Sequence, residues 1–198
     1  YSELKDTELT NLVSWYNLNE AVEDNGLILD QVDPSYSFGS ELITNGTMEA
    51  DSNWGDSQHI VGTQTRSSDY AQSGTYSRKV NFSGSQDYQG AKSDTFSLTA
   101  GKIYKLDGYI YTTSGTNARI NISDGAYGAN KSAGSFMPDD HYIGGSVTNG
   151  SWQRVTGYFT ALGSTSSAKV WIWGKLVVAY FDNVSLTEVT GGGNHGTI

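Results

Sequence analysis

Aromatic side chains on two predicted strands are the residues of this sequence best suited to chemistry. Tyr109 and Tyr111 share one face of one strand, and Trp171 and Trp173 share one face of a later strand. Sugar rings have apolar C–H faces that stack on aromatic rings, while polar side chains bind the hydroxyl groups. We therefore predict a shallow glycan-binding groove on one face of one concave sheet. Its predicted residues are Tyr109, Tyr111, Arg119, Asn121, Trp171 and Trp173.

The outward direction of these side chains follows from strand periodicity. Successive side chains of a strand point to opposite faces of a sheet. Trp171 and Trp173 therefore lie opposite the aliphatic residues of their strand, and they share the parity of Lys169 and Lys175. The shared parity with two lysines indicates that this face meets water.

Catalytic residues are poorly represented. The three histidines, His59, His141 and His195, have no serine or aspartate partner at a motif spacing. Glycosidases need two carboxylates that face each other across a cleft, and no alternating strand displays such a pair. We therefore expect a binding module rather than an enzyme. The alternative is a structural or assembly domain of a virion or filament, whose aromatic surface contacts protein subunits.

The charge of the chain limits its partners. The 198 residues include 12 Lys and Arg against 21 Asp and Glu, which gives a formal net charge of -9. Because nucleic-acid affinity depends on Lys and Arg that neutralise phosphates, we expect no nucleic-acid partner. No apolar run approaches the ~20 residues that span a bilayer, so we expect no membrane insertion. Cysteine is absent, which excludes disulfides and thiolate metal sites.

From residue 41 onward the sequence predicts an all-β domain. Short alternating runs are separated by turns rich in Gly, Ser and Asn, a pattern typical of a β-sandwich jelly roll. Residues 1–40 form an acidic N-terminal extension, residues 41–187 the domain, and residues 188–198 a linker or tail. The clearest predicted strands are Ser77–Ser83, Ile103–Thr112, Ala118–Ser123, Gln153–Thr160, Ala168–Gly174 and Val178–Leu186.

Five segments, in order, resemble the family 4/9 type of carbohydrate-binding module, which has a galactose-binding-like β-jelly roll. They cover roughly residues 40–187. Two positions depart from the family pattern, because Met48 stands where the family has Phe and Asn183 stands where it has a second Asp. The five segments are Glu41–Glu49 followed by Trp54, Ser73–Val80, Leu98–Tyr104, Ser151–Val155 and Tyr180–Leu186.

The resemblance implies a structural Ca²⁺ that ties the first strand of the domain to the last. Hard cations such as Ca²⁺ take several oxygen ligands from carboxylates and backbone carbonyls. The corresponding positions here are Glu49, Asp182 and the turn around Ser73 and Thr75. The alternative is that both carboxylates are ordinary hydrogen-bonded groups at the rim. We expect no metal at a second cluster, Asp139–His141.

The two ends of the chain carry a second resemblance. Asn11–Glu20 is similar to the opening strand of a laminin-G or concanavalin-like domain, and Asn194–Ile198 is similar to a later segment of that family. This arrangement implies a module inserted near the start of a lectin-like domain. We therefore expect a non-catalytic glycan-binding module of a larger extracellular or virion surface protein. Its expected partner is a polysaccharide or a cell-surface glycan, as in adhesion.

Overall fold

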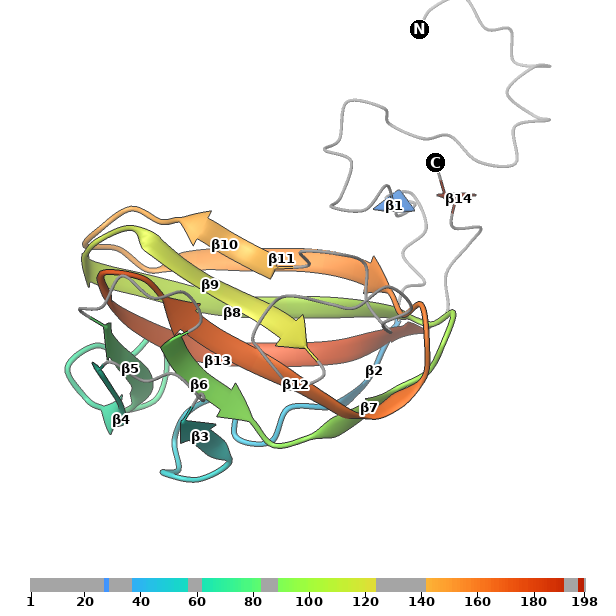
Figure 1. Cartoon of the computed structure of the whole chain (residues 1–198), viewed down its shortest axis with the longest axis horizontal. Coiled ribbons are helices and arrows are strands. Elements are labelled where there is room, and N and C mark those ends of the chain that lie inside the picture. Colours follow the sequence, from blue (N-terminus) through green and yellow to red (C-terminus); the bar gives the residue numbers. More distant parts are fainter. Residues whose placement is uncertain are drawn as a thin grey trace, which may run out of the picture.

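The computed structural model describes residues 27–28, 37–56, 62–82, 89–123, 142–190 and 196–197. Within these ranges the chain forms strands and turns without a helix, which confirms the predicted all-β class. Two six-stranded sheets stack as a β-sandwich (Figure 1). The same ranges contain no helix long and apolar enough to cross a membrane.

The first sheet has the strand order β10-β9-β12-β6-β3, and β7 also pairs with β12. We call it the tryptophan sheet, because Trp171 and Trp173 project from its outer face. All of its strand pairs are antiparallel. Its strands are β3 (Trp54–Asp56), β6 (Gln89–Ser93), β7 (Phe96–Leu98), β9 (Asn117–Ser123), β10 (Tyr142–Ser146) and β12 (Thr165–Gly174).

The second sheet has the strand order β11-β8-β13-β5-β4, and β2 also pairs with β13. We call it the tyrosine sheet, because Tyr109 and Tyr111 project from its outer face. It is antiparallel as well. Its strands are β2 (Ser37–Glu41), β4 (Gly62–Ser67), β5 (Ser77–Phe82), β8 (Ile103–Ser114), β11 (Gln153–Thr160) and β13 (Val177–Thr190).

A short strand pair lies outside the two sheets. β1 (Leu27–Ile28) pairs antiparallel with β14 (Gly196–Thr197), so the predicted extension and the predicted tail meet there. The sandwich itself runs from Ser37 to Thr190, slightly beyond the predicted domain limits. The segment 11–20, which carries part of the second resemblance, lies outside the described residues, and so does the Asp139–His141 cluster.

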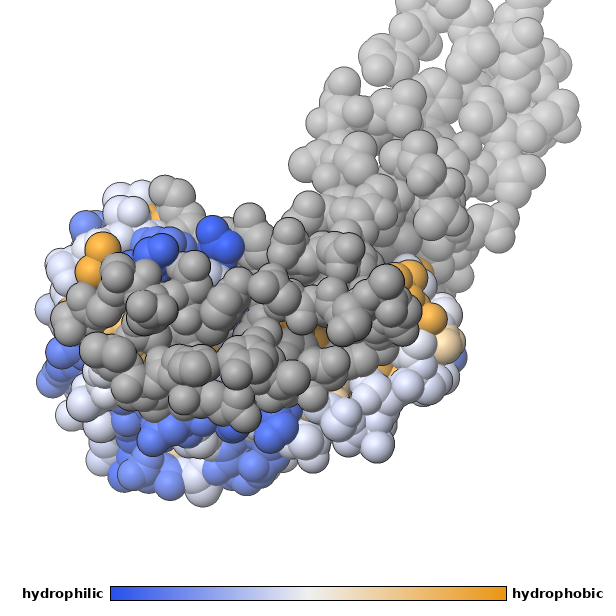
Figure 2. Space-filling view, viewed as in Figure 1, coloured by the Kyte–Doolittle hydropathy of each residue, from blue (hydrophilic) through white to orange (hydrophobic). Residues whose placement is uncertain are grey.

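The core lies between the two sheets and follows the predicted alternation. On β8, Tyr104, Leu106 and Ile110 are buried, while Tyr109 and Tyr111 stay partly exposed. Alternation of this kind buries every second side chain of a strand against the facing sheet. In Figure 2, hydrophilic residues gather along the lower rim of the described surface, where β3 lies in Figure 1. Other fully buried core residues are Val80, Ile120, Phe159, Val170, Ile172, Ala179 and Phe181.

The first and last segments of the sandwich lie side by side, as predicted. The N–H of Leu42 donates to the carbonyl of Leu186 at 3.0 Å, and the N–H of Val184 donates to the carbonyl of Gly46 at 2.9 Å. Gly46 permits this approach, because a Cβ there would lie 1.9 Å from the Val184 carbonyl oxygen. We call this junction between residues 41–47 and β13 the seam. It brings the segments that carry the predicted metal ligands Glu49 and Asp182 together.

Candidate functional site

The buried carboxylate of Asp182 anchors a loop formed by residues 72–76. Asp182 lies on β13, and its side chain is fully buried. Its Oδ2 accepts hydrogen bonds from the N–H groups of Gln72 (2.8 Å) and Ser73 (3.2 Å), and its Oδ1 accepts one from Asn183 (2.7 Å). Asn183, which replaces the second Asp of the family pattern, also donates from Nδ2 to Ser73 Oγ at 2.9 Å.

Glu49 holds the other half of the same loop. Its Oε1 accepts hydrogen bonds from the N–H groups of Thr75 (2.9 Å) and Tyr76 (3.1 Å). Gly74 separates the two halves, with a φ of 64° that places it in the left-handed region. A Cβ at Gly74 would lie 2.2 Å from Glu49 Oε1, so the loop needs glycine at this position. The four predicted metal-site residues therefore meet at one place.

The two carboxylates have opposite electrostatic environments. Hydrogen bonds from the Tyr76 and Thr75 amides lower the pKa of Glu49. Burial raises the pKa of Asp182, the amides of the loop offset part of that effect, and the negative charge of Glu49 adds to it. A cation beside both groups would relieve their repulsion and the cost of burying Asp182.

The donor set at this loop fits a hard cation in part. Among the described residues, no three His, Asp or Glu side chains form a metal-binding group. A cation beside Glu49 and Asp182 would therefore take its remaining ligands from hydroxyl and backbone oxygens of the loop. Ca²⁺ accepts such oxygen ligands readily, whereas Zn²⁺ prefers nitrogen and sulfur ligands.

The six predicted glycan-binding residues do not share one sheet. Tyr109 and Tyr111 lie on β8 in the tyrosine sheet, whereas the other four lie on β9 and β12 in the tryptophan sheet. The outer faces of two stacked sheets point in opposite directions, so the prediction of a single groove is wrong. Alternation identifies the face of a strand on which a residue lies, but it does not say which sheet the strand joins.

The outer face of the tryptophan sheet combines aromatic rings with polar and cationic side chains. Trp171 is paired in register with Asn121 on β9 and with Lys92 on β6, and Trp173 is paired with Arg119. Lys92 Nζ lies 5.6 Å from the ring centre of Trp171, and Arg119 Cζ lies 5.0 Å from that of Trp173. Both contacts are in the range of cation–π interactions.

The environment of the two tryptophans differs from the prediction. Trp171 is 1 % exposed and Trp173 is 4 % exposed, so the expectation that their rings meet water is wrong. Neither residue belongs to the core between the sheets, which confirms that both lie on the outer face. Part of this burial is due to Lys92 and Arg119. These long side chains come from the neighbouring strands and lie over the rings of Trp171 and Trp173.

This face contains a buried donor and a buried acceptor that bond to no residue in the described ranges. Within the described part of the chain, Trp171 Nε1 and Asn117 Oδ1 have no hydrogen-bond partner. Asn117 lies on β9 with the same parity as Arg119 and Asn121. A buried donor or acceptor without a partner costs about 1–3 kcal/mol. A donor and an acceptor on one face suit a ligand with hydroxyl groups, since each hydroxyl both donates and accepts.

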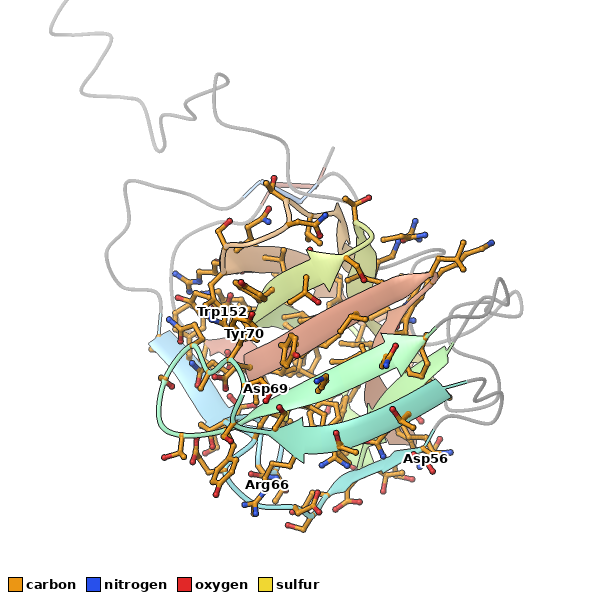
Figure 3. The ribbon with its side chains drawn as sticks, turned by 90° about the vertical axis from the view of Figure 1, so that its left-hand side faces the viewer. Asp56, Arg66, Asp69, Tyr70 and Trp152 are labelled. Carbon is orange, nitrogen blue, oxygen red and sulfur yellow. The ribbon has the colours of Figure 1, made fainter. Side chains whose placement is uncertain are left out.

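A cluster of aromatic rings covers part of the opposite, tyrosine face. Tyr70, which is 39 % exposed, stacks on Tyr111 with ring centres 4.4 Å apart and lies edge-on to Tyr180 at 4.9 Å. Tyr111 also lies 5.6 Å from the ring of Trp152. Figure 3 shows Tyr70 and Trp152 on the same side of the molecule. Tyr111 was the only member predicted, although Trp152 and Tyr180 lie in segments that resemble the family.

An ion pair borders this tyrosine cluster. Lys79 Nζ lies 2.7 Å from Asp69 Oδ2, and the hydroxyl of Tyr180 donates to the same oxygen at 3.3 Å. The hydrogen bond from Lys79 lowers the pKa of Asp69, while burial raises the pKa of Tyr180. Asp69 and Tyr70 precede residues 72–76, so these contacts fix the start of the loop that Glu49 and Asp182 hold.

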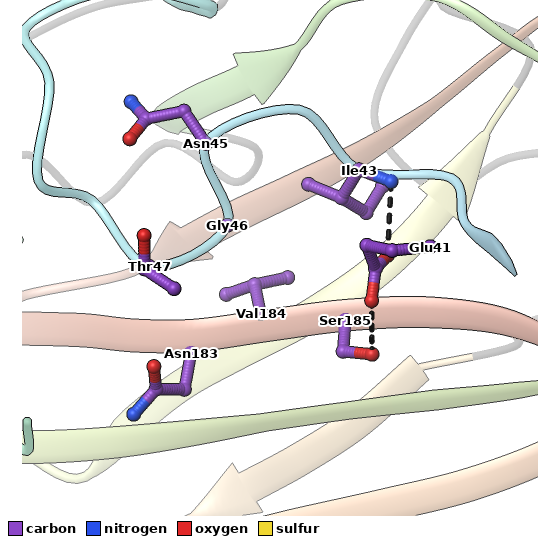
Figure 4. Close-up of a pocket in the computed structure, with 8 residues that line it drawn as sticks. All are labelled: Glu41, Ile43, Asn45, Gly46, Thr47, Asn183, Val184 and Ser185. Atoms are coloured by element: carbon purple, nitrogen blue, oxygen red, sulfur yellow. Dashed lines mark hydrogen bonds between the residues drawn. The ribbon is translucent and has the colours of Figure 1, made fainter.

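A pocket of about 270 Å³ lies along the seam between residues 41–47 and β13 (Figure 4). Glu41 is the one charged side chain among the residues that line it. Its Oε1 accepts hydrogen bonds from the N–H groups of Ile43 (2.9 Å) and Leu186 (2.8 Å), and its Oε2 bonds to Ser185 Oγ. The carboxylate is thus used to join β2 to β13, and the pocket has no free charge for a ligand.

Comparisons with known proteins agree with this fold. A family described as a carbohydrate binding domain, CBM 4/9, matches residues 40–179. No curated protein matches the chain. A solved structure of the CBM22-1 and GH10 modules of Clostridium thermocellum xylanase 10B, in complex with xylohexaose, is 18 % identical with a TM-score of 0.55. The match covers 76 % of this chain and 28 % of that one.

Two isolated binding modules are similar over almost their whole length. The CBM22-1 xylan-binding domain of Paenibacillus barcinonensis Xyn10C is 12 % identical with a TM-score of 0.53, and the match covers 80 % of this chain and 98 % of that one. A family 16 carbohydrate binding module is 20 % identical with a TM-score of 0.50, over 73 % and 98 % of the two chains. At these identities the likeness shows a shared fold. Because the family match spans residues 40–179, well over half of the sequence, the chain belongs to the CBM 4/9 family of carbohydrate-binding domains.

Proposed function

We propose that the outer face of the tryptophan sheet binds a polysaccharide and does not cleave it. The observation that carries this proposal is the buried indole Nε1 of Trp171, a donor without a partner in the described part of the chain, on the same face as the acceptor Asn117 Oδ1. Arg119 and Asn121 add polar groups to this face. Xylan is the first polysaccharide to test, because similar modules are described as xylan-binding.

In the proposed complex, a sugar ring stacks on one indole and accepts or donates hydrogen bonds at its edge. Lys92 and Arg119 lie over the rings of Trp171 and Trp173, so a sugar must displace them or bind between them. The indole N–H of Trp171 then donates to a sugar hydroxyl, which satisfies the buried donor.

The experiment replaces the indole while keeping an aromatic ring. We expect Trp171→Phe to weaken xylan retention in affinity gel electrophoresis roughly three- to tenfold, because one hydrogen bond is worth about 0.5–1.5 kcal/mol net. Trp171→Ala should weaken it further, and Trp152→Phe, on the opposite face, should leave it unchanged. Near-UV circular dichroism checks that each variant is folded. If folded Trp171→Phe and Trp171→Ala bind as the parent does, the binding face lies elsewhere.

We further propose that the module tethers a larger extracellular protein to its polysaccharide. A neighbour supports this proposal, because the xylanase 10B structure contains a carbohydrate-binding module and a GH10 module in one chain. A virion context stays a prediction. Retention of a fused fluorescent protein on insoluble xylan, with Trp171→Ala as the matched control, measures tethering directly.

We also propose that Glu49, Asp182 and oxygens of the 72–76 loop hold a structural Ca²⁺. The raised pKa of Asp182, due to burial and in part to the charge of Glu49, supports a cation at this place. A bound Ca²⁺ would neutralise both carboxylates and join the first segment of the domain to the last. A saturating chelator should lower the melting temperature of the parent, and added Ca²⁺ should restore it. Asp182→Asn should lose this response, Asp69→Asn should keep it, and an unchanged melt of the parent would remove the metal.

A further inference from the structure

The charged side chains of the three central strands of the tryptophan sheet are all cationic. β6, β9 and β12 contribute Lys92, Arg119 and Lys169, and their sequences contain no Asp or Glu. Lys175 directly follows β12, and Asp94 directly follows β6. The whole chain carries a formal net charge of -9, so this local excess of positive charge runs against the composition.

The cations of the tyrosine sheet have a different arrangement. Ion pairs with carboxylates use five of the cations on and beside it, while Arg66 on β4 donates to the backbone carbonyl of Glu49. Lys92 and Lys169, in contrast, form no ion pair with any residue in the described ranges. The pairs are Arg78–Asp51 (2.6 Å), Lys79–Asp69 (2.7 Å), Lys102–Glu188 (3.0 Å), Lys105–Asp107 (3.4 Å) and Arg154–Asp107.

Both of these lysines lie beside the tryptophan of the proposed binding face. Lys169 is two residues from Trp171 on the same face of β12, a separation of about 7 Å along a strand. Lys92 is paired in register with Trp171 on the adjacent strand, about 5 Å away across the sheet. Both side chains are partly exposed, so a ligand that displaces the side chains covering the Trp171 ring would reach both ammonium groups.

We propose that this face selects polysaccharides that carry anionic groups, either uronate carboxylates or sulfate esters. The inference rests on the proposed function and names the substrate class of the same site. Charge-assisted hydrogen bonds to an anion are roughly twice as strong as neutral ones, and the planar fork of Arg119 matches a carboxylate or a sulfate. A neutral glycan would use the ring and the amide and would accept hydrogen bonds from the lysines, but it would form no ion pair with them.

A polysaccharide fits these observations better than a nucleic acid, the other polymer that combines anions with stacking rings. The chain belongs to a family of carbohydrate-binding domains. The Debye length is about 10 Å at 0.1 M salt, so the distant negative charges of the protein are screened and the adjacent lysines act.

The experiment measures binding of the full chain to polygalacturonate, to the same polymer after reduction of its carboxyl groups, and to dextran sulfate with dextran as its neutral partner. We expect tighter binding to either anionic polymer than to its neutral partner, and loss of that preference near 1 M salt, where the Debye length is about 3 Å. Lys92→Gln and Lys169→Gln should each weaken anionic binding roughly two- to fivefold at low salt. Lys92→Arg should retain it, and Lys102→Gln, which removes the same charge beside the tyrosine sheet, should have no effect.

The outcomes separate this inference from the proposed function. Equal affinity for a charged polymer and its neutral partner overturns the anionic preference and leaves glycan binding in place. Binding to none of these polymers, nor to xylan, overturns the proposed function itself. Binding of a single-stranded oligodeoxynucleotide as tightly as dextran sulfate, with the same loss in Lys92→Gln, overturns the choice of a polysaccharide. A preference for either uronate or sulfate supports the proposal and identifies the anion.

Discussion

Glu49 and Asp182 accept hydrogen bonds from the two sides of a single glycine. Asp182 binds the amides just before Gly74, and Glu49 binds the amides just after it. The two carboxylates come from the opening and closing segments of the sandwich, which lie side by side. The loop around Gly74 therefore closes the seam of the domain, whether or not a cation joins the two carboxylates.

The conformation of this loop predicts an unequal effect of two alanine substitutions. Gly74 and Gly101 both have positive φ values, 64° and 77°. A Cβ at Gly101 meets nothing within 4 Å, whereas a Cβ at Gly74 collides with Glu49 Oε1. We expect Gly101→Ala to lower the free energy of unfolding by about 1–2 kcal/mol, the cost of the left-handed conformation, and Gly74→Ala to lower it by more. Urea denaturation measures both, and equal losses would show that the contact with Glu49 is unimportant.

The ring of Tyr70 is expected to stabilise the loop without binding glycan. Tyr70 stacks on Tyr111 at 4.4 Å, and such pairs contribute about 0.5–1.5 kcal/mol beyond the burial of area. Tyr70→Ala should lower the melting temperature, and Tyr70→Phe should preserve it, because the ring is kept. Polysaccharide affinity should be unchanged in both variants. A loss of affinity in Tyr70→Ala as large as in Trp171→Ala would instead place the glycan on the tyrosine face.

The Asp107–Arg154 pair predicts a dependence of stability on pH. Burial favours the neutral form of Asp107, but hydrogen bonds and charges from Arg154 and Lys105 outweigh it and lower its pKa. The native pKa thus lies below that of the unfolded chain. The pair therefore stabilises the fold above pH ~4, the ordinary aspartate value, and this contribution is lost as the pH falls through the native pKa.

The variant Arg154→Met tests this pair. We expect it to raise the pKa of Asp107, observed by NMR titration of the carboxyl carbon, and to flatten the loss of stability in acid. Lys102→Met, which removes a cation paired with Glu188, serves as the control and should leave the titration of Asp107 unchanged. An unchanged pKa of Asp107 in Arg154→Met would contradict the assigned cause.

Neighbouring residues on β12 should separate stability from binding. Ile172 is fully buried in the core, whereas Trp171 lies on the outer face of the same strand. We expect Ile172→Ala to lower the free energy of unfolding by about 2–5 kcal/mol, and Ile172→Val by about 0.5–1.5 kcal/mol. Calorimetric titration at a temperature where each variant is folded should show polysaccharide affinity equal to that of the parent. Weaker binding by folded Ile172→Val would mean that the face depends on core packing.

The regular strands could be predicted because each sheet has an apolar face toward the core and a more polar outer face. This difference produces an alternating pattern in the sequence of each strand. β8 alternates between buried and partly exposed residues over most of its length, and Tyr109 and Tyr111 share its outer face, as the sequence predicted. β6, in contrast, has the sequence QGAKS and contains little apolar alternation. Its place is set by pairing with β12, where a Cβ at Gly90 would lie 1.9 Å from the carbonyl oxygen of Ile172. Lys92 could not be assigned to the proposed binding face without that pairing.

By itself, the sequence determined which side chains point into the sandwich and which point out, since the two-residue period of a strand is a local property. Through the family resemblance the sequence also predicted that Glu49 and Asp182 lie at one site, and the fold brings both carboxylates to one loop. Only the tertiary structure decided that Tyr111 and Trp171 lie on opposite sheets, and that Trp171 is covered rather than exposed. Both depend on which distant strands pair, and strand pairing is decided by the packing of the whole core rather than by the pattern within any one strand.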